Sequence, residues 1–281
     1  MLALLALVVS LATPPPGAAI PRQPGALASS LSSTERALAA AVDRWDSSAA
    51  PTRELTLYAL YEQRILIVLS ERRATANAVL ERLPPALARR VRNELTARRD
   101  LRGLSTPRPL SAFRTGRAAP AAWLLAYYRE AQQRFGVGWH VLAAVNYVES
   151  AFNKLRNSST AGAQGPMQFI PSTWRAYGLG GDVHDPHDAI LGAANYLHAN
   201  GAPGAYGRAL YRYNPSARYV DAVLRYARRF RADPRAFAVL YARQVFVRTP
   251  RGLVRITGPG RVSPGAAASR SRRSGQAAPR G

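Results

Sequence analysis

The sequence predicts a mainly α-helical protein, and three observations support this prediction. Apolar residues recur three or four positions apart, as Leu38, Ala41 and Trp45 do, which gives a helix one apolar face. Prolines and glycines divide the chain into helix-sized segments. Only two short segments, 244–247 and 253–256, favour strands.

The first part of the chain predicts a helical N-terminal region over residues 29–101. Three helices are expected there, at 33–45, 52–83 and 86–101. Residues 102–118 then become rich in Gly, Pro, Ser and Arg, a composition that is typical of a linker.

Residues 119–246 predict a second domain of short helices separated by glycine-rich loops. Helices are expected at 121–135, 138–150, 171–177, 185–198, 205–213 and 217–230. The start at 185 is the clearest, because Asp185 can cap the helix and Pro186 suits its first position. Residues 247–281 contain eight arginines and no acidic residue, which predicts a disordered basic tail.

The charge balance and the lack of cysteine restrict the possible functions. The 281-residue chain has 39 Lys+Arg against 16 Asp+Glu, a formal net charge of +23. This excess favours a polyanionic partner, such as nucleic acid, anionic lipid or a cell-wall polymer. No cysteine is present, which excludes disulfides, cysteine-ligated zinc, iron–sulfur clusters and a catalytic thiol.

Residues 1–28 resemble a secretory signal peptide. The first twelve residues are almost wholly apolar but too few to cross a bilayer, which takes roughly 20 residues. Ala26-Leu27-Ala28 supplies a small-x-small cleavage site before Ser29, although no Arg or Lys precedes the apolar run. We therefore expect an exported protein, secreted or held in the cell envelope; a buried or interfacial N-terminal helix is the alternative.

A carboxyl group is the best candidate for catalysis. Without cysteine, the other options are a serine–histidine pair and a histidine–carboxylate metal site. Between the predicted linker and tail the glutamates are Glu130, which lies among polar residues, and Glu149. Glu149 shares a helix face with Leu142 and Val145, and burial there would raise its pKa and keep it protonated near neutral pH. A structural hydrogen bond or ion pair is the alternative role for such a residue.

Four motifs follow one another from Glu149 onward. They are Glu149-Ser150-Ala151-Phe152-Asn153, Gly162-Ala163-Gln164-Gly165-Pro166-Met167-Gln168, Asp185-Pro186-His187-Asp188-Ala189-Ile190 with Ala193-Ala194-Asn195-Tyr196-Leu197, and Tyr213-Asn214. Their order and spacing resemble the catalytic domain of the soluble lytic transglycosylases, the peptidoglycan-cleaving branch of the lysozyme-like fold. The resemblance covers about residues 119–232 and implies a lysozyme-like catalytic domain.

The resemblance also implies roles for individual residues. Glu149 would be the sole catalytic acid and base, and Tyr213 would orient and polarise its carboxyl group. The implied substrate-binding residues are Ser159, Met167, Gln168, Tyr213 and Asn214. Counting forward from Glu149 places Ser158, rather than Ser159, beside the N-acetyl group of the reacting sugar, so either serine fits.

The implied reaction cleaves the MurNAc-β-1,4-GlcNAc bond of peptidoglycan and leaves 1,6-anhydromuramyl ends, with no cofactor. Conventional glycosidases use two carboxylates, and here only Glu149 is placed by a motif. The 2-acetamido group of the substrate can then replace the missing nucleophile. Asp182 is the candidate second carboxylate, and it would make the protein a lysozyme-type hydrolase instead.

Competing interpretations remain open at this point. Residues 182–188 hold three Asp and two His, but Asp185 and Asp188 are explained as helix-start residues, so we expect no metal. A non-catalytic protein that binds cell wall or polyanion is the second functional class. We expect peptidoglycan glycan strands as partner, anionic wall polymers or a membrane surface as further partners of the basic tail, and no nucleic acid.

Overall fold

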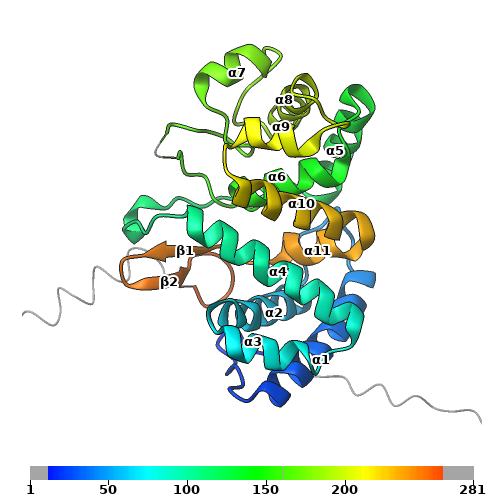
Figure 1. Cartoon of the computed structure of the whole chain (residues 1–281), viewed down its shortest axis with the longest axis vertical. Coiled ribbons are helices and arrows are strands. Elements are labelled where there is room, and N and C mark those ends of the chain that lie inside the picture. The colour runs from blue at the N-terminus through cyan, green and yellow to red at the C-terminus, as the bar shows by residue number, and fades with distance from the viewer. Residues whose placement is uncertain (1–11, 160, 262–281) are drawn as a thin grey trace, which may run out of the picture.

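A computed structural model describes residues 12–159 and 161–261 (Figure 1). Within these ranges the chain forms eleven α-helices, one 3-10 turn and one β-hairpin. The N-terminal helices are α1 (Pro24–Asp43), α2 (Arg53–Glu71), α3 (Arg73–Leu80) and α4 (Pro85–Leu104). After the 3-10 turn η1 (Leu110–Ala112) come α5 (Ala121–Phe135), α6 (Trp139–Ser150), α7 (Pro171–Tyr177), α8 (Pro186–Ala199), α9 (Tyr206–Tyr213), α10 (Ala217–Ala232) and α11 (Arg235–Ala242). The mainly α prediction is confirmed.

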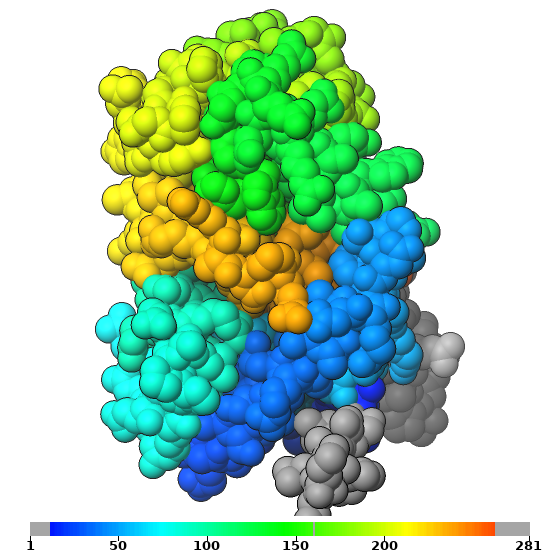
Figure 2. All heavy atoms as spheres, turned by 90° about the vertical axis from the view of Figure 1, so that its right-hand side faces the viewer, coloured from blue at the N-terminus to red at the C-terminus, as the bar shows by residue number. Residues whose placement is uncertain are grey.

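The two helical regions share one hydrophobic core. Helix α10 packs between α4 on one side and α6 on the other. Leu55 of α2 and Ala97 of α4 therefore join the same buried cluster as Leu142 of α6 and Val223 of α10. Figure 2 shows the N-terminal helices, in blue and cyan, directly against α10 and α11, in orange. A second apolar cluster lies among α1–α4 alone.

The N-terminal helices differ from the predicted segments in two places. Helix α1 begins at Pro24 instead of 33, so the predicted cleavage site after Ala28 falls inside a helix where Leu27 and Ala28 are buried. The apolar run at residues 1–11 lies outside the described residues, and the signal peptide stays a prediction. In the described part of the chain no helix combines the length and apolar character that crossing a membrane requires.

The long helix predicted over 52–83 is interrupted. Arg72, with φ −118° and ψ 86°, separates α2 from α3. Helix α4 in turn continues to Leu104, past the predicted start of the linker at 102, and an irregular segment follows until α5. Tertiary packing on α10 explains the extension of α4, whose composition alone indicates a break.

A β-hairpin follows α11, where the disordered basic tail was predicted to begin. Strands β1 (Phe246–Thr249) and β2 (Gly252–Arg255) pair antiparallel, with Val247 opposite Val254. Val247 is buried in a small cluster with Val245 and Ile256. The predicted tail boundary at 247 is therefore wrong, because an apolar face anchors the arginine-containing strands. Residues 262–281 of the predicted tail lie outside the described residues.

Candidate active site

A cavity of about 710 Å³ lies beside the C-terminal end of α6, and we name it the Glu149 cleft. Its lining includes Glu149 and Tyr219 from α6 and α10, Ile67 and Glu71 from α2, Arg98 and Leu101 from α4, and Phe246 and Leu253 from the hairpin. The cleft is therefore not a product of the second domain alone.

Glu149 occupies the last turn of α6 and lines this cleft. Burial raises the pKa of its carboxyl group to about 7, and a hydrogen bond from Tyr219 partly opposes this rise. The Tyr219 hydroxyl donates to Glu149 Oε1 at 2.6 Å. The carboxyl group is thus held in place and can carry a proton near neutral pH, as the sequence predicts. Such a group can act first as an acid and then as a base.

The backbone after Glu149 turns sharply through a left-handed conformation. Ala151, Phe152 and Asn153 have φ values of 50°, 61° and 64°, which non-glycine residues rarely adopt. Ser150 stabilises the turn, because its Oγ accepts the backbone N–H of Asn153 at 2.9 Å. Phe152 is fully buried against the aromatic ring of Phe237. Packing and hydrogen bonding thus hold a strained turn next to the carboxyl group.

Two hydrogen bonds attach the loop over residues 164–169 to α6. Asn146 Nδ2 and Ser150 Oγ donate to the carbonyl of Pro166 at 2.9 and 2.6 Å. Gly165 has φ +72°, and a Cβ there would lie 1.9 Å from the carbonyl oxygen of Val183. This glycine permits a close approach between two segments of the chain.

The structure shows what Tyr213 and Met167 contact, and polarisation of Glu149 by Tyr213 stays a prediction. Tyr213 donates its hydroxyl proton to the carbonyl of Met167 at 2.6 Å, whereas Tyr219 makes the hydrogen bond to Glu149. The Met167 side chain is fully buried in the main core, so its predicted place in the lining of the cleft is wrong. Both residues position the loop behind the carboxyl group.

The remaining predicted binding residues lie in different surroundings. Asn214 lines the cleft together with Glu149. Gln168 donates through Nε2 to the carbonyls of Asn157 and Gly165, at 3.1 and 3.0 Å, and so braces its own loop. Ser159 Oγ accepts the N–H groups of Ala161 and Ala163, so it closes a turn. Substrate contacts by Gln168, Ser158 or Ser159 stay predictions.

Sequence reasoning missed Tyr219 and the wall of the cleft outside the second domain. Tyr219, Ala222, Val223 and Tyr226 have the spacing of a buried helix face. This pattern could have predicted that the Tyr219 side chain is buried. The contribution of α4 and the hairpin carries no comparable signal, because it depends on packing between segments more than a hundred residues apart.

A buried ionic cluster adjoins the Glu149 cleft, whose lining includes Arg243 and Arg98. Arg243 is almost fully buried and donates to Glu94 Oε1 at 2.7 Å and Glu62 Oε2 at 3.0 Å. Burial alone would raise the pKa of Glu94, but Arg243, Arg98 and Arg229 outweigh it and lower this pKa to about 2. Arg243 also donates to the hydroxyl of Tyr147, two residues before Glu149. The cluster ties α2 and α4 to the second domain.

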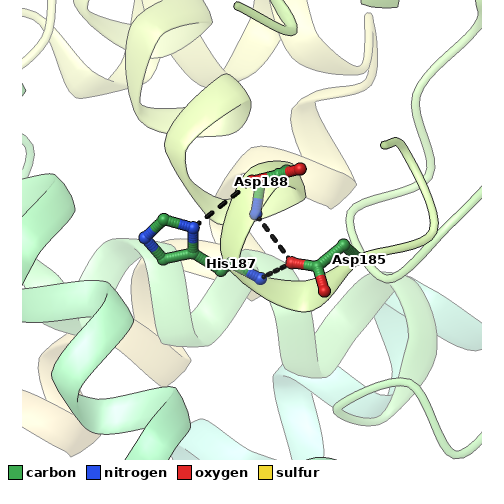
Figure 3. A group of neighbouring side chains, drawn as sticks. All are labelled: Asp185, His187 and Asp188. Carbon is green, nitrogen blue, oxygen red and sulfur yellow. Dashed lines mark hydrogen bonds and ion pairs between the residues drawn. The ribbon is translucent and has the colours of Figure 1, made fainter. Parts of the chain in front are cut away.

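Asp185, His187 and Asp188 are the described residues whose side chains could share a metal ion (Figure 3). Asp185 Oδ1 accepts the N–H groups of His187 and Asp188 at 2.8 and 3.1 Å, which confirms its predicted role as helix cap. Burial would lower the pKa of His187, but hydrogen bonds to Glu130 and Asp188 raise it. These hydrogen bonds account for the arrangement of the three side chains at the start of α8.

Comparison with known proteins gives a family for the part that carries Glu149. The family model described as Transglycosylase SLT domain matches residues 126–234. A curated relative, the membrane-bound lytic murein transglycosylase F of Thiobacillus denitrificans, is 38% identical over 71 residues. That match covers 25% of this chain and 15% of the relative, so the chain spans a small part of its length. No solved structure was found to match the chain. Residues 126–234 are therefore an SLT-family domain of the mainly α, lysozyme-like type.

Proposed function

We propose that the protein is a lytic transglycosylase that cleaves the MurNAc-β-1,4-GlcNAc bond of peptidoglycan and leaves 1,6-anhydromuramyl ends. The observation that carries this proposal is Glu149, a carboxyl group with a pKa of about 7 in a cleft of an SLT-family domain. The resemblance in sequence motifs and the name of the curated relative support the same reaction.

In the proposed mechanism Glu149 first donates one proton and later accepts another. Protonated Glu149 gives its proton to the glycosidic oxygen, while the 2-acetamido carbonyl of the muramyl residue attacks its own anomeric carbon and the C–O bond to GlcNAc breaks. Glu149, now a carboxylate, takes the proton of the muramyl 6-hydroxyl. The O6 atom then displaces the acetamido oxygen from the anomeric carbon, which closes the anhydro ring and restores the acid without consuming water.

The carboxylates around the cleft support this route over hydrolysis. Among the described residues that line it, Glu71 is the other carboxylate, and its Oε1 lies 3.2 Å from Arg102 NH1 in an ion pair. Asp182, the candidate second carboxylate, is not in the lining, and its Oδ1 accepts the N–H of His184. A hydrolase would need a base near the anomeric carbon, and neither residue is suited to that task.

We also propose that the protein acts in the cell envelope, because its substrate is found there. The curated relative is named as membrane-bound. The formal net charge of +23 supports electrostatic attraction to the anionic wall or to a membrane surface. Assays at two salt concentrations test this attraction, since screening weakens it.

The decisive experiment compares Glu149→Gln with the wild-type protein on purified peptidoglycan. We expect at least a thousandfold loss of product, because glutamine cannot donate the proton, and retained binding to the glycan. Glu130→Gln is the matched control, since it makes the same change in the same domain outside the cleft. Mass spectrometry of wild-type products should show muropeptides lighter by one water than reducing ends. Reducing ends would establish a hydrolase, and unchanged peptidoglycan would favour a binding protein.

A further inference from the structure

One wall of the Glu149 cleft lies wholly outside the range that matches the SLT family. We name it the α4–hairpin wall and define it as Arg98, Arg102, Leu104, Arg248 and Leu253, all of which line the cavity. Residues 126–234 include none of them. The chemistry of this wall is therefore supplied by segments outside the family match.

The wall carries three guanidinium groups with uncommitted donors. Arg98 donates Nε to Glu94 at 2.9 Å, but its NH2 nitrogen is buried without a hydrogen-bond partner among the described residues. Arg102 pairs with Glu71 only through NH1, at the exposed edge of the cleft. Arg248 uses NH1 for the carbonyls of Arg102 and Ser105, at 2.9 and 2.6 Å. Because each guanidinium has five donors, Arg102 and Arg248 can still bind an anion.

The same wall also presents exposed apolar side chains. Leu104 and Leu253 both line the cleft, and they are 42% and 43% exposed. The leucines can contact small apolar residues of a ligand, and the arginines can bind its carboxylates. Within peptidoglycan, the short peptide attached to the muramyl lactyl group has this chemistry, whereas the neutral sugars do not.

We propose that the α4–hairpin wall is a subsite for the carboxylate-bearing peptide carried by the glycan, with Arg102 and Arg248 contacting its carboxylates. The inference rests on the proposed function, because the peptide reaches this wall when its glycan lies at Glu149. It makes the protein selective for peptide-bearing strands over stripped strands.

Binding can test the subsite without relying on cleavage. In the Glu149→Gln background, cosedimentation would be measured with three insoluble peptidoglycans: native, stripped of peptide by an amidase, and native with its carboxyl groups chemically amidated. We expect Arg102→Gln with Arg248→Gln to weaken binding to the native material about tenfold and to leave binding to the other two unchanged. Arg248→Lys should retain the native binding, because it keeps the charge.

A matched control accounts for the general attraction of a cationic chain to an anionic polymer. Arg89→Gln with Arg92→Gln removes two exposed charges from the same helix outside the Glu149 cleft, so it measures the non-specific part. Equal weakening on all three materials, no weakening beyond this control, or no binding to any material would overturn the subsite. Wild-type protein that binds native strands selectively but cleaves none would instead overturn the proposed function alone.

Discussion

Partial or full burial disfavours the charged form of both Glu149 and Glu94, yet their acid–base behaviour is opposite. Glu149 receives a hydrogen bond from the neutral hydroxyl of Tyr219, and burial raises its pKa to about 7. Glu94 is more deeply buried, with only 3% of its surface exposed, but Arg243 and Arg229 donate to it and its pKa falls to about 2. Burial alone therefore does not decide the charge of a carboxyl group; its partners do.

The difference separates a reactive group from a structural one within a single core. A carboxyl group that must give up and regain a proton near neutral pH needs burial without a cation. A carboxylate that joins helices needs the cation, since an unpaired buried charge would destabilise the fold. Each of the following predictions changes one side of this comparison.

Arg243→Met should have the largest effect on stability, because it leaves Glu62 and Glu94 buried with fewer cations. We expect a loss of about 3–5 kcal/mol in the free energy of unfolding. Urea denaturation followed by circular dichroism would measure it. Arg235→Met, which removes an exposed pair with Asp43, is the control and should leave the free energy of unfolding nearly unchanged. Similar losses for both variants would contradict the structural role of the cluster.

The two glutamates should also give opposite dependences of stability on pH. The raised pKa of Glu149 means that its contribution is fully present below its unfolded pKa of 4.5 and is lost as pH rises through about 7. The lowered pKa of Glu94 gives a contribution that is present above 4.5 and is lost as pH falls through about 2.

Glu149→Gln removes the pH-dependent contribution of Glu149 to stability and leaves that of Glu94 in place. At pH 8 the variant should be more stable than the wild type by about 2 kcal/mol, while at pH 4 the two should agree. Denaturation midpoints measured between pH 3 and pH 9 would test this, and the acid limb should be the same for both proteins. A constant difference at every pH would mean that the carboxyl group titrates normally.

The smallest expected effect concerns the two tyrosines. Tyr219→Phe removes a hydrogen bond that favours the carboxylate, so the alkaline limb of kcat/KM should move up by about one pH unit. Tyr213→Phe is the control, because its hydroxyl donates to Met167 and not to the acid. That variant should leave the limb in place while lowering stability by about 1 kcal/mol. Movement of the limb in Tyr213→Phe alone would restore the role first predicted for Tyr213.

Local patterns in the sequence predicted much of what depends on local chemistry. The start of α8 follows from Asp185 and Pro186, and the structure confirms both as cap and first residue. The raised pKa of Glu149 follows from its apolar neighbours on α6. These features need only the residues within one or two helical turns, which is the range over which such patterns are informative.

What depends on distant packing could not be predicted in this way. Tyr213 and Tyr219 lie six residues apart, and which of them meets Glu149 is decided by how α9 and α10 are placed against α6. Met167 belongs to the motif, but its side chain is fully buried in the main hydrophobic core. The segments 244–247 and 253–256 favoured strands, but the arginine-rich composition indicated a disordered tail from 247 onward, and the apolar anchor formed by Val247 and Ile256 depends on packing.

The core shared by α2, α4, α6 and α10 limits how this protein can be divided or recombined. Cutting the chain at the edges of the SLT match would strip Leu55 and Ala97 from apolar neighbours and would leave Arg229 without the carboxylates that it meets on α2 and α4. If residues 126–234 were grafted into another protein, the apolar face of α10 would be exposed to solvent. Chimeras that carry α2 and α4 together with residues 126–234 should stay in solution, whereas residues 126–234 alone should aggregate.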